Sequence, residues 1–93
     1  MLSKIPEDLR KVPKDQLNAE ILRVGMIAEL DAVSLYEQLA AITDKEDIKK
    51  VLIDITKEEK THLGEFQTLL LKYDSEQVKE LEAGKKEVEE LTG

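Results

Sequence analysis

No cysteine occurs among the 93 residues of this chain. Disulfide bonds and thiolate metal ligands are therefore excluded, and any bound metal ion must be held by oxygen atoms and imidazole nitrogen. Such donors favour iron, manganese or calcium. Long apolar runs are missing too, both the run of about 7 to 15 residues that a signal peptide needs and the run of about 18 that spans a bilayer. We therefore expect no membrane association and a cytoplasmic location.

Basic residues are in the minority, with 14 Lys and Arg against 21 Asp and Glu, for a net charge of -7. Nucleic-acid phosphates demand a basic face, and here the acidic residues are spread through every segment. We exclude nucleic acid as a partner, and metal cations are the more natural ligands for such a chain.

Proline occurs only twice, at Pro6 and Pro13. The two prolines break residues 1–13 into an irregular arm, because proline disrupts a helix interior. From there residues 14–42 contain no proline and repeat apolar side chains at helical spacing, which predicts a long first helix. Gly25 lies inside it and costs about 1 kcal/mol relative to alanine without ending a helix of this length.

The next boundary is Thr43-Asp44-Lys45-Glu46, which has the form of a capping box. In that motif Thr43 accepts a hydrogen bond from the amide of Glu46, and a second helix follows over residues 44–73. The connection between the two helices is so short that they must form an antiparallel hairpin.

A third, weaker helix is predicted over residues 75–91, capped by Asp74 or Ser75. No repeat, low-complexity tract or linker suggests a second domain. We therefore expect residues 1–93 to form a single all-α domain, with a two-helix hairpin and a short third helix.

Each long helix carries acid within its apolar stripe. On residues 44–73 the stripe runs at steps of four and three through Ile48, Leu52, Ile55, Glu59, His62, Phe66, Leu69 and Tyr73. On residues 14–42 it runs through Leu22, Met26, Glu29, Val33, Tyr36 and Ala40. Both helices thus direct carboxylates toward the core.

The two carboxylates are also expected at one height in the hairpin. Glu29 lies about 14 to 15 residues before the turn and Glu59 about 15 to 16 after it, so at ~1.5 Å per residue their heights differ by ~1.5 Å. An unpaired carboxylate in an apolar seam costs several kcal/mol, and two of them beside His62 call for a cation. We predict that Glu29, Glu59 and His62 bind metal.

This chain supplies half of a known ligand set. Di-iron four-helix proteins use a Glu-x-x-His pair on each of two helices and a single Glu on each of the other two. Two copies of the chain would complete that set and would also cover the seam that one hairpin leaves exposed. The prediction is a four-helix bundle built by a homodimer, with two iron ions at the interface.

Two segments, AELDAVSLYEQ (28–38) and EEKTHLGEF (58–66), resemble the paired motifs of encapsulated ferritins. The resemblance covers residues 22–74 well and the third helix more loosely. It implies a ferritin-like ferroxidase that oxidises Fe(II) with O2, assembles as a decameric ring of dimers, and stores iron inside an encapsulin shell.

The resemblance also assigns residues. Glu29, Glu59 and His62 match the family's iron ligands, and Tyr36 matches a tyrosine beside the metals. Some bacterial members carry an acid at the position of Ala28 and a tryptophan at the position of Leu35, both near a proposed ion-entry site. Of the residues at that site, this chain retains only Asp31.

The C-terminus shows no recognisable shell-docking tail. Its absence suits either a domain of a fusion with the shell protein or a chain trimmed before its tail, and the sequence does not separate the two.

Two other functions stay open. One is a non-enzymatic helical assembly module whose buried acids bind a structural calcium or zinc ion. The other is a rubrerythrin-like peroxidase, against which the missing cysteine counts, because such proteins usually carry a cysteine-ligated electron-donating domain. A Glu-x-x-His spacing alone is weak evidence in an acidic helical chain. The level placement of Glu29 opposite this pair is what strengthens the metal hypothesis.

Overall fold

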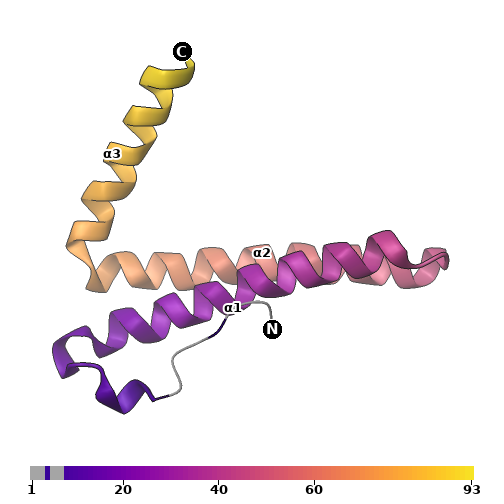
Figure 1. Cartoon of the computed structure of the whole chain (residues 1–93), viewed down its shortest axis with the longest axis horizontal. Coiled ribbons are helices and arrows are strands. Elements are labelled where there is room, and N and C mark those ends of the chain that lie inside the picture. The colour runs from indigo at the N-terminus through magenta and orange to yellow at the C-terminus, as the bar shows by residue number, and fades with distance from the viewer. Residues whose placement is uncertain (1–3, 5–7) are drawn as a thin grey trace.

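The computed structural model describes residue 4 and residues 8–93, and this part of the chain contains helices and no strand. The elements in order are η1 Leu9–Lys11, α1 Lys14–Ile42, α2 Glu46–Tyr73 and α3 Ser75–Thr92. Helices α1 and α2 run side by side in opposite directions, and α3 rises away from the end of α2 (Figure 1). The predicted all-α class and the antiparallel hairpin are confirmed. Among the helices described, none is long and apolar enough to cross a membrane.

In the described part of the N-terminal arm, residues Leu9–Lys11 form a short turn of 3-10 helix, η1. The Asp8 carboxylate accepts hydrogen bonds from the Arg10 guanidinium at 2.9 Å and from the Arg10 amide at 3.0 Å. These bonds lower the pKa of Asp8, and the side-chain bond raises the pKa of Arg10. Helix α1 then begins after Pro13, as predicted, since a proline suits the start of a helix. Pro6 lies outside the described residues.

The predicted capping box at the hairpin turn is wrong. Thr43 ends α1, with its amide donating to the Leu39 carbonyl at 3.2 Å, and its hydroxyl accepts from the amide of Lys45 rather than that of Glu46. Helix α2 therefore begins at Glu46, two residues later than expected, with no side-chain cap. Thr43 is already engaged as the C-cap of α1, so it lies too far back to cap the next helix.

The hairpin buries few side chains in full. Those below a tenth exposed are Leu22 and Ala40 on α1 and Thr56 and Leu70 on α2. The Thr56 hydroxyl donates to the Leu52 carbonyl at 2.8 Å, which satisfies it within its own helix and allows the side chain to be buried. Sequence patterning missed Thr56 because hydroxyl residues are mostly exposed.

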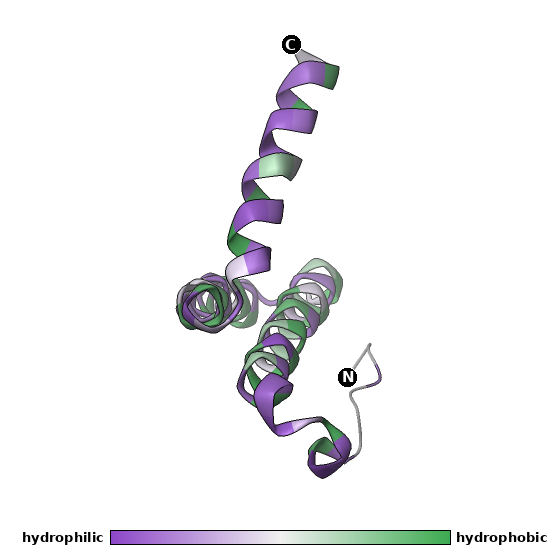
Figure 2. Ribbon diagram, turned by 90° about the vertical axis from the view of Figure 1, so that its left-hand side faces the viewer, coloured by the Kyte–Doolittle hydropathy of each residue, from purple (hydrophilic) through white to green (hydrophobic). Residues whose placement is uncertain are grey.

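The predicted α2 stripe is only partly correct. Ile48, His62, Leu69 and Tyr73 belong to that stripe, yet they are exposed. The stripe is wider than one neighbouring helix can cover, so α1 buries one edge and the other edge faces outward. The described chain measures 47 × 43 × 19 Å, about two helix diameters at its thinnest. Figure 2 likewise shows hydrophobic residues around the surfaces of both hairpin helices.

Helix α3 is anchored at its first turn. The Asp74 carboxylate accepts from the Gln77 amide at 3.0 Å, so of the two predicted caps, Asp74 and Ser75, Asp74 is the N-cap. Its other oxygen lies 3.4 Å from the Arg23 guanidinium, which also contacts Glu20 at 3.1 Å. Beyond this corner α3 has no buried residue. Asp74 therefore links the start of α3 to α1.

We predict that Asp74→Ala loosens the first turn of α3. Loss of an N-cap costs about 1 kcal/mol, whereas a half-exposed ion pair contributes less. Amide hydrogen exchange at Gln77 and Val78 should accelerate several-fold in Asp74→Ala. Asp74→Asn should stay near wild type, because asparagine caps as well as aspartate does. Equal exchange in all three proteins would show that the cap does not hold this corner.

Candidate metal centre

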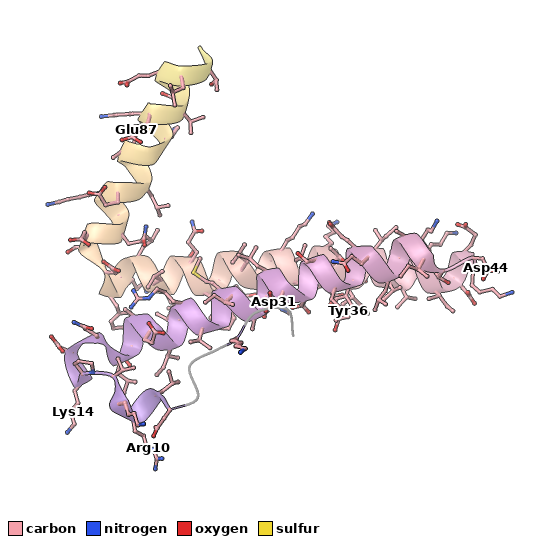
Figure 3. The ribbon with its side chains drawn as sticks, viewed as in Figure 1. Arg10, Lys14, Asp31, Tyr36, Asp44 and Glu87 are labelled. Carbon is pink, nitrogen blue, oxygen red and sulfur yellow. The ribbon has the colours of Figure 1, made fainter. Side chains whose placement is uncertain are left out.

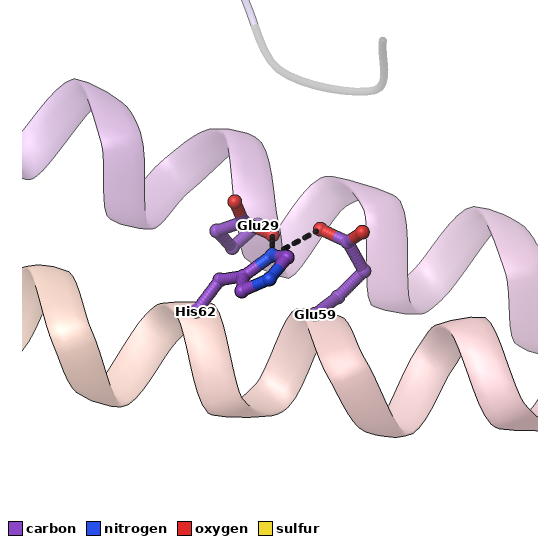
Figure 4. A group of neighbouring side chains, drawn as sticks. All are labelled: Glu29, Glu59 and His62. Atoms are coloured by element: carbon purple, nitrogen blue, oxygen red, sulfur yellow. Dashed lines mark ion pairs between the residues drawn. The ribbon is translucent and has the colours of Figure 1, made fainter.

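Three chemically reactive side chains meet between the two long helices. Glu29 comes from the middle of α1, and Glu59 and His62 come from successive turns of α2 (Figure 4). Three residues of separation place Glu59 and His62 on one side of their helix. The side chains of Glu29 and Glu59 are 15% and 20% exposed, while that of His62 is 46% exposed. The carboxylates thus lie inside the seam and the imidazole stands at its outer edge.

The distances fit a shared cation better than a hydrogen-bonded cluster. Nδ1 of His62 lies 3.6 Å from Oε2 of Glu29 and 3.6 Å from Oε2 of Glu59, both too long for hydrogen bonds. The three residues can offer ligand atoms that all lie within 4.8 Å of one another. Ligands about 2.1 Å from a single ion are separated by roughly 3 to 4 Å. Small side-chain adjustments would bring all three onto one metal ion.

One oxygen at this centre lacks a hydrogen bond. Oε2 of Glu29 is buried and has no hydrogen-bond partner among the described residues, and its one ion-pair contact is the imidazole of His62 at 3.6 Å. Leaving such an atom without a partner costs about 1–3 kcal/mol, and more when it is charged. A bound cation would remove that cost. Two carboxylates and an imidazole suit iron, manganese or zinc, so the donor set fits the predicted iron.

The residues predicted around the centre are not part of this group. Tyr36 lies half-buried on α1, between the centre and the hairpin turn, and Asp31 is half-buried on the same helix (Figure 3). Neither belongs to the three residues that offer close ligand atoms. The role of Tyr36 beside the metal and that of Asp31 at an entry path stay predictions.

The imidazole opens onto an exposed apolar surface. His62 shares one line of α2 with Ile48 and Leu69, because seven residues are nearly two full turns. Ile21 and Leu69 border the same shallow hollow, so Ile21 and the α1 residues in line with it lie on this side as well. We call this surface the open face; its exposed members are Ile21, Leu35, Ile42, Ile48, His62, Leu69 and Tyr73. Their heptad spacing in the sequence was the signal that could have separated this face from the buried seam.

Comparison with known proteins gives one matching family model and one similar solved structure. A family model described as ubiquinone biosynthesis protein COQ7 matches residues 16–90. The crystal structure of the encapsulated ferritin domain from Pyrococcus furiosus superimposes with a TM-score of 0.80 at 46% identity, covering 100% of this chain and 89% of that one. The chain belongs to the encapsulated ferritins. The COQ7 match agrees with a ferritin-like fold.

Two longer relatives extend this family. A ferritin-like-encapsulin shell fusion protein of Pyrococcus furiosus is 57% identical over 74 residues, which is 80% of this chain and 21% of that protein. Encapsulin nanocompartment cargo protein EncC of Myxococcus xanthus is 36% identical over 69 residues, 71% of this chain and 53% of EncC. This encapsulated ferritin therefore spans about a fifth to a half of the length of these relatives.

We predict that Glu29→Gln stabilises the metal-free protein. The substitution removes a buried negative charge opposite Glu59 and places an amide donor beside the carboxylate, which we expect to add about 1 kcal/mol to the free energy of unfolding. Urea unfolding in the presence of a chelator measures this free energy of unfolding. Glu58→Gln is the control, because Glu58 is exposed and its replacement should stay within about 0.5 kcal/mol. A clear loss of stability in Glu29→Gln would mean that the carboxylate has a partner.

Proposed function

We propose that this encapsulated ferritin is a ferroxidase, which oxidises Fe(II) to Fe(III) with O2 at a di-iron site formed between two copies of the chain. The observation that carries the proposal is the meeting of Glu29, Glu59 and His62 beside the open face. One copy offers two carboxylates and one imidazole. A second copy, packed on the open face about a two-fold axis, doubles this to the four Glu and two His of di-iron four-helix proteins.

The residues have distinct tasks in this scheme. Glu29 and Glu59 bind Fe(II) through oxygen and offset its charge, and His62 adds a nitrogen ligand from the exposed edge of the seam. Bound iron supplies the redox chemistry, since each Fe(II) gives up one electron and O2 accepts the electrons. The protein's contribution is to hold two ions close together while apolar helices exclude bulk water.

The open face and α3 support assembly. A surface lined by large exposed apolar residues marks an interaction site on a protein this thin. The apolar side chains of α3 are also exposed; they are Val78, Leu81, Val88 and Leu91. We propose that the open face forms the dimer and that further contacts join dimers into a decameric ring. Native mass spectrometry would then find ten times the 10.6 kDa of one chain.

The relatives support a place inside a protein shell. One is named a shell fusion protein and the other a nanocompartment cargo protein. We propose that this chain likewise works within an encapsulin nanocompartment and passes its ferric product to a mineral store there.

The function predicts that Glu29→Ala, Glu59→Ala and His62→Ala each remove most aerobic Fe(II) oxidation, because each deletes a ligand. Helix content by circular dichroism should stay close to wild type, since none of the three is a buried apolar residue. Glu58→Ala is the matched control, being the exposed neighbour of Glu59, and should oxidise Fe(II) normally. Absorbance at ultraviolet wavelengths, where ferric species absorb, follows the reaction.

The shared site adds a dependence on protein concentration. Specific activity should fall on dilution as dimers dissociate, and Fe(II) should drive association. A monomer with full activity would refute the intermolecular site. A dimer that binds zinc or calcium tightly and leaves Fe(II) unoxidised would instead favour the structural-metal module.

We also predict a role for Tyr36 across the dimer interface. It lies seven residues after Glu29, about 10 Å nearer the turn, and its side chain leans back toward the helix N-terminus. Under two-fold packing the partner's His62 reaches the same height, so the hydroxyl can orient that imidazole. Tyr36→Phe should retain bound iron and slow oxidation about 10-fold. Unchanged oxidation kinetics in Tyr36→Phe would remove this role.

A further inference from the structure

Gly25 of α1 lies directly against the ring of Phe66 on α2. A Cβ atom at Gly25 would lie 2.9 Å from Cε1 of Phe66 and 3.0 Å from both Cδ1 and Cζ. These atoms form one continuous edge of the ring, from Cδ1 out to Cζ, and the planar ring can relieve the contact only by moving as a unit. Glycine, which has no Cβ atom, is therefore the residue that this contact accommodates.

This contact lies one helical turn from the metal centre on both helices. Gly25 precedes Glu29 by four residues, and Phe66 follows His62 by four. Because the helices are antiparallel, both lie about one turn farther from the hairpin turn than these ligands. Helical side chains lean toward the N-terminus, which carries the Phe66 ring toward the turn of His62. The ring thus separates α1 from α2 beside the ligands, and its fit against bare backbone sets their spacing.

A methyl group at Gly25 leaves two ways to relax, and both reach the centre. If α1 and α2 move apart, Glu29 recedes from Glu59 and His62. If the half-buried Phe66 ring swings outward, it moves onto the open face beside His62, its neighbour one turn away. Metal ligands must be held within about half an ångström of their productive geometry, so either movement weakens binding.

We propose that Gly25 is a positioning residue for the metal centre, which sets the distance between Glu29 and the Glu59–His62 pair by admitting the Phe66 ring. The proposal deepens the proposed ferroxidase function and rests on it. It also accounts for a glycine in the middle of a long helix, where alanine is the better helix former.

The chain provides matched controls. Gly64 and Gly84 are also helical and exposed, and a Cβ atom at either would meet nothing within 4 Å. Gly64 is the sharper control, since it lies two residues after His62 but about 200° around the helix from it. Gly64→Ala should raise the melting temperature by roughly 4 °C through helix propensity alone. The melting temperature of Gly25→Ala should rise less than that of Gly64→Ala, or fall.

The decisive measurement is Co(II) binding by the full chain. The protein is first freed of metal with a chelator and then titrated with Co(II), and the visible absorption of bound Co(II) reports binding. Co(II) probes the ligand geometry without any oxidation. Wild type and Gly64→Ala should bind with affinities within about 2-fold of each other, and Gly25→Ala should bind about 10-fold more weakly or worse. Gly25→Ala with the same affinity as Gly64→Ala would overturn the proposal.

A second substitution tests the steric cause. Phe66→Leu removes the ring edge, so Gly25→Ala combined with Phe66→Leu should bind Co(II) within about 3-fold of Phe66→Leu alone. An added loss of about 10-fold in the double variant would overturn the proposal. If Gly25→Ala alone does not fold, this pair decides the question in the same way. Absence of Co(II) binding by wild type would instead refute the metal site itself, and the proposal with it.

Discussion

The burial of the Glu29 carboxylate between two helices is the constraint on which the rest of this structure depends. Its hidden oxygen faces Glu59 and His62 without a hydrogen bond. Like charges at this distance repel, and an unpaired buried charge costs several kcal/mol, whereas exposed ion pairs such as Lys60–Glu37 return little. Placing this acid in the seam therefore lowers the stability of the metal-free hairpin, and a bound cation would offset that cost.

The thinness of the molecule is connected to the same buried carboxylate. Two helices bury only a handful of side chains, and part of the apolar surface they leave, the open face, lies on the side where His62 emerges. A closed monomeric core would enclose the acids and shut out the second set of ligands. An open half-bundle keeps the carboxylates at an edge that a second copy would cover in the proposed dimer. The same residues would then complete both the bundle and the ligand set.

Local signals in the sequence were enough to predict much of this architecture. Pro13 and Asp74 mark helix starts by their own chemistry, and counting residues from the turn brought Glu29 level with Glu59. Properties that depend on a neighbour were missed. Thr56 is buried because its hydroxyl bonds within its own helix, and α2 starts late because Thr43 is engaged by α1. The role of Gly25 depends on which ring lies opposite, and one-dimensional spacing does not encode that.

In the proposed dimer, metal binding and association would form a single linked equilibrium. If a second copy completes the ligand set, metal binds the dimer more tightly than the monomer, and by thermodynamic reciprocity metal strengthens the dimer by the same factor. The desolvation of Glu29 and Glu59 would contribute to both, since a copy packed on the open face would remove water from carboxylates whose charge a bound cation offsets. Under the proposed function, the carboxylates would therefore oppose assembly without metal and favour it with metal. Iron binding and formation of the bundle would then be one cooperative step.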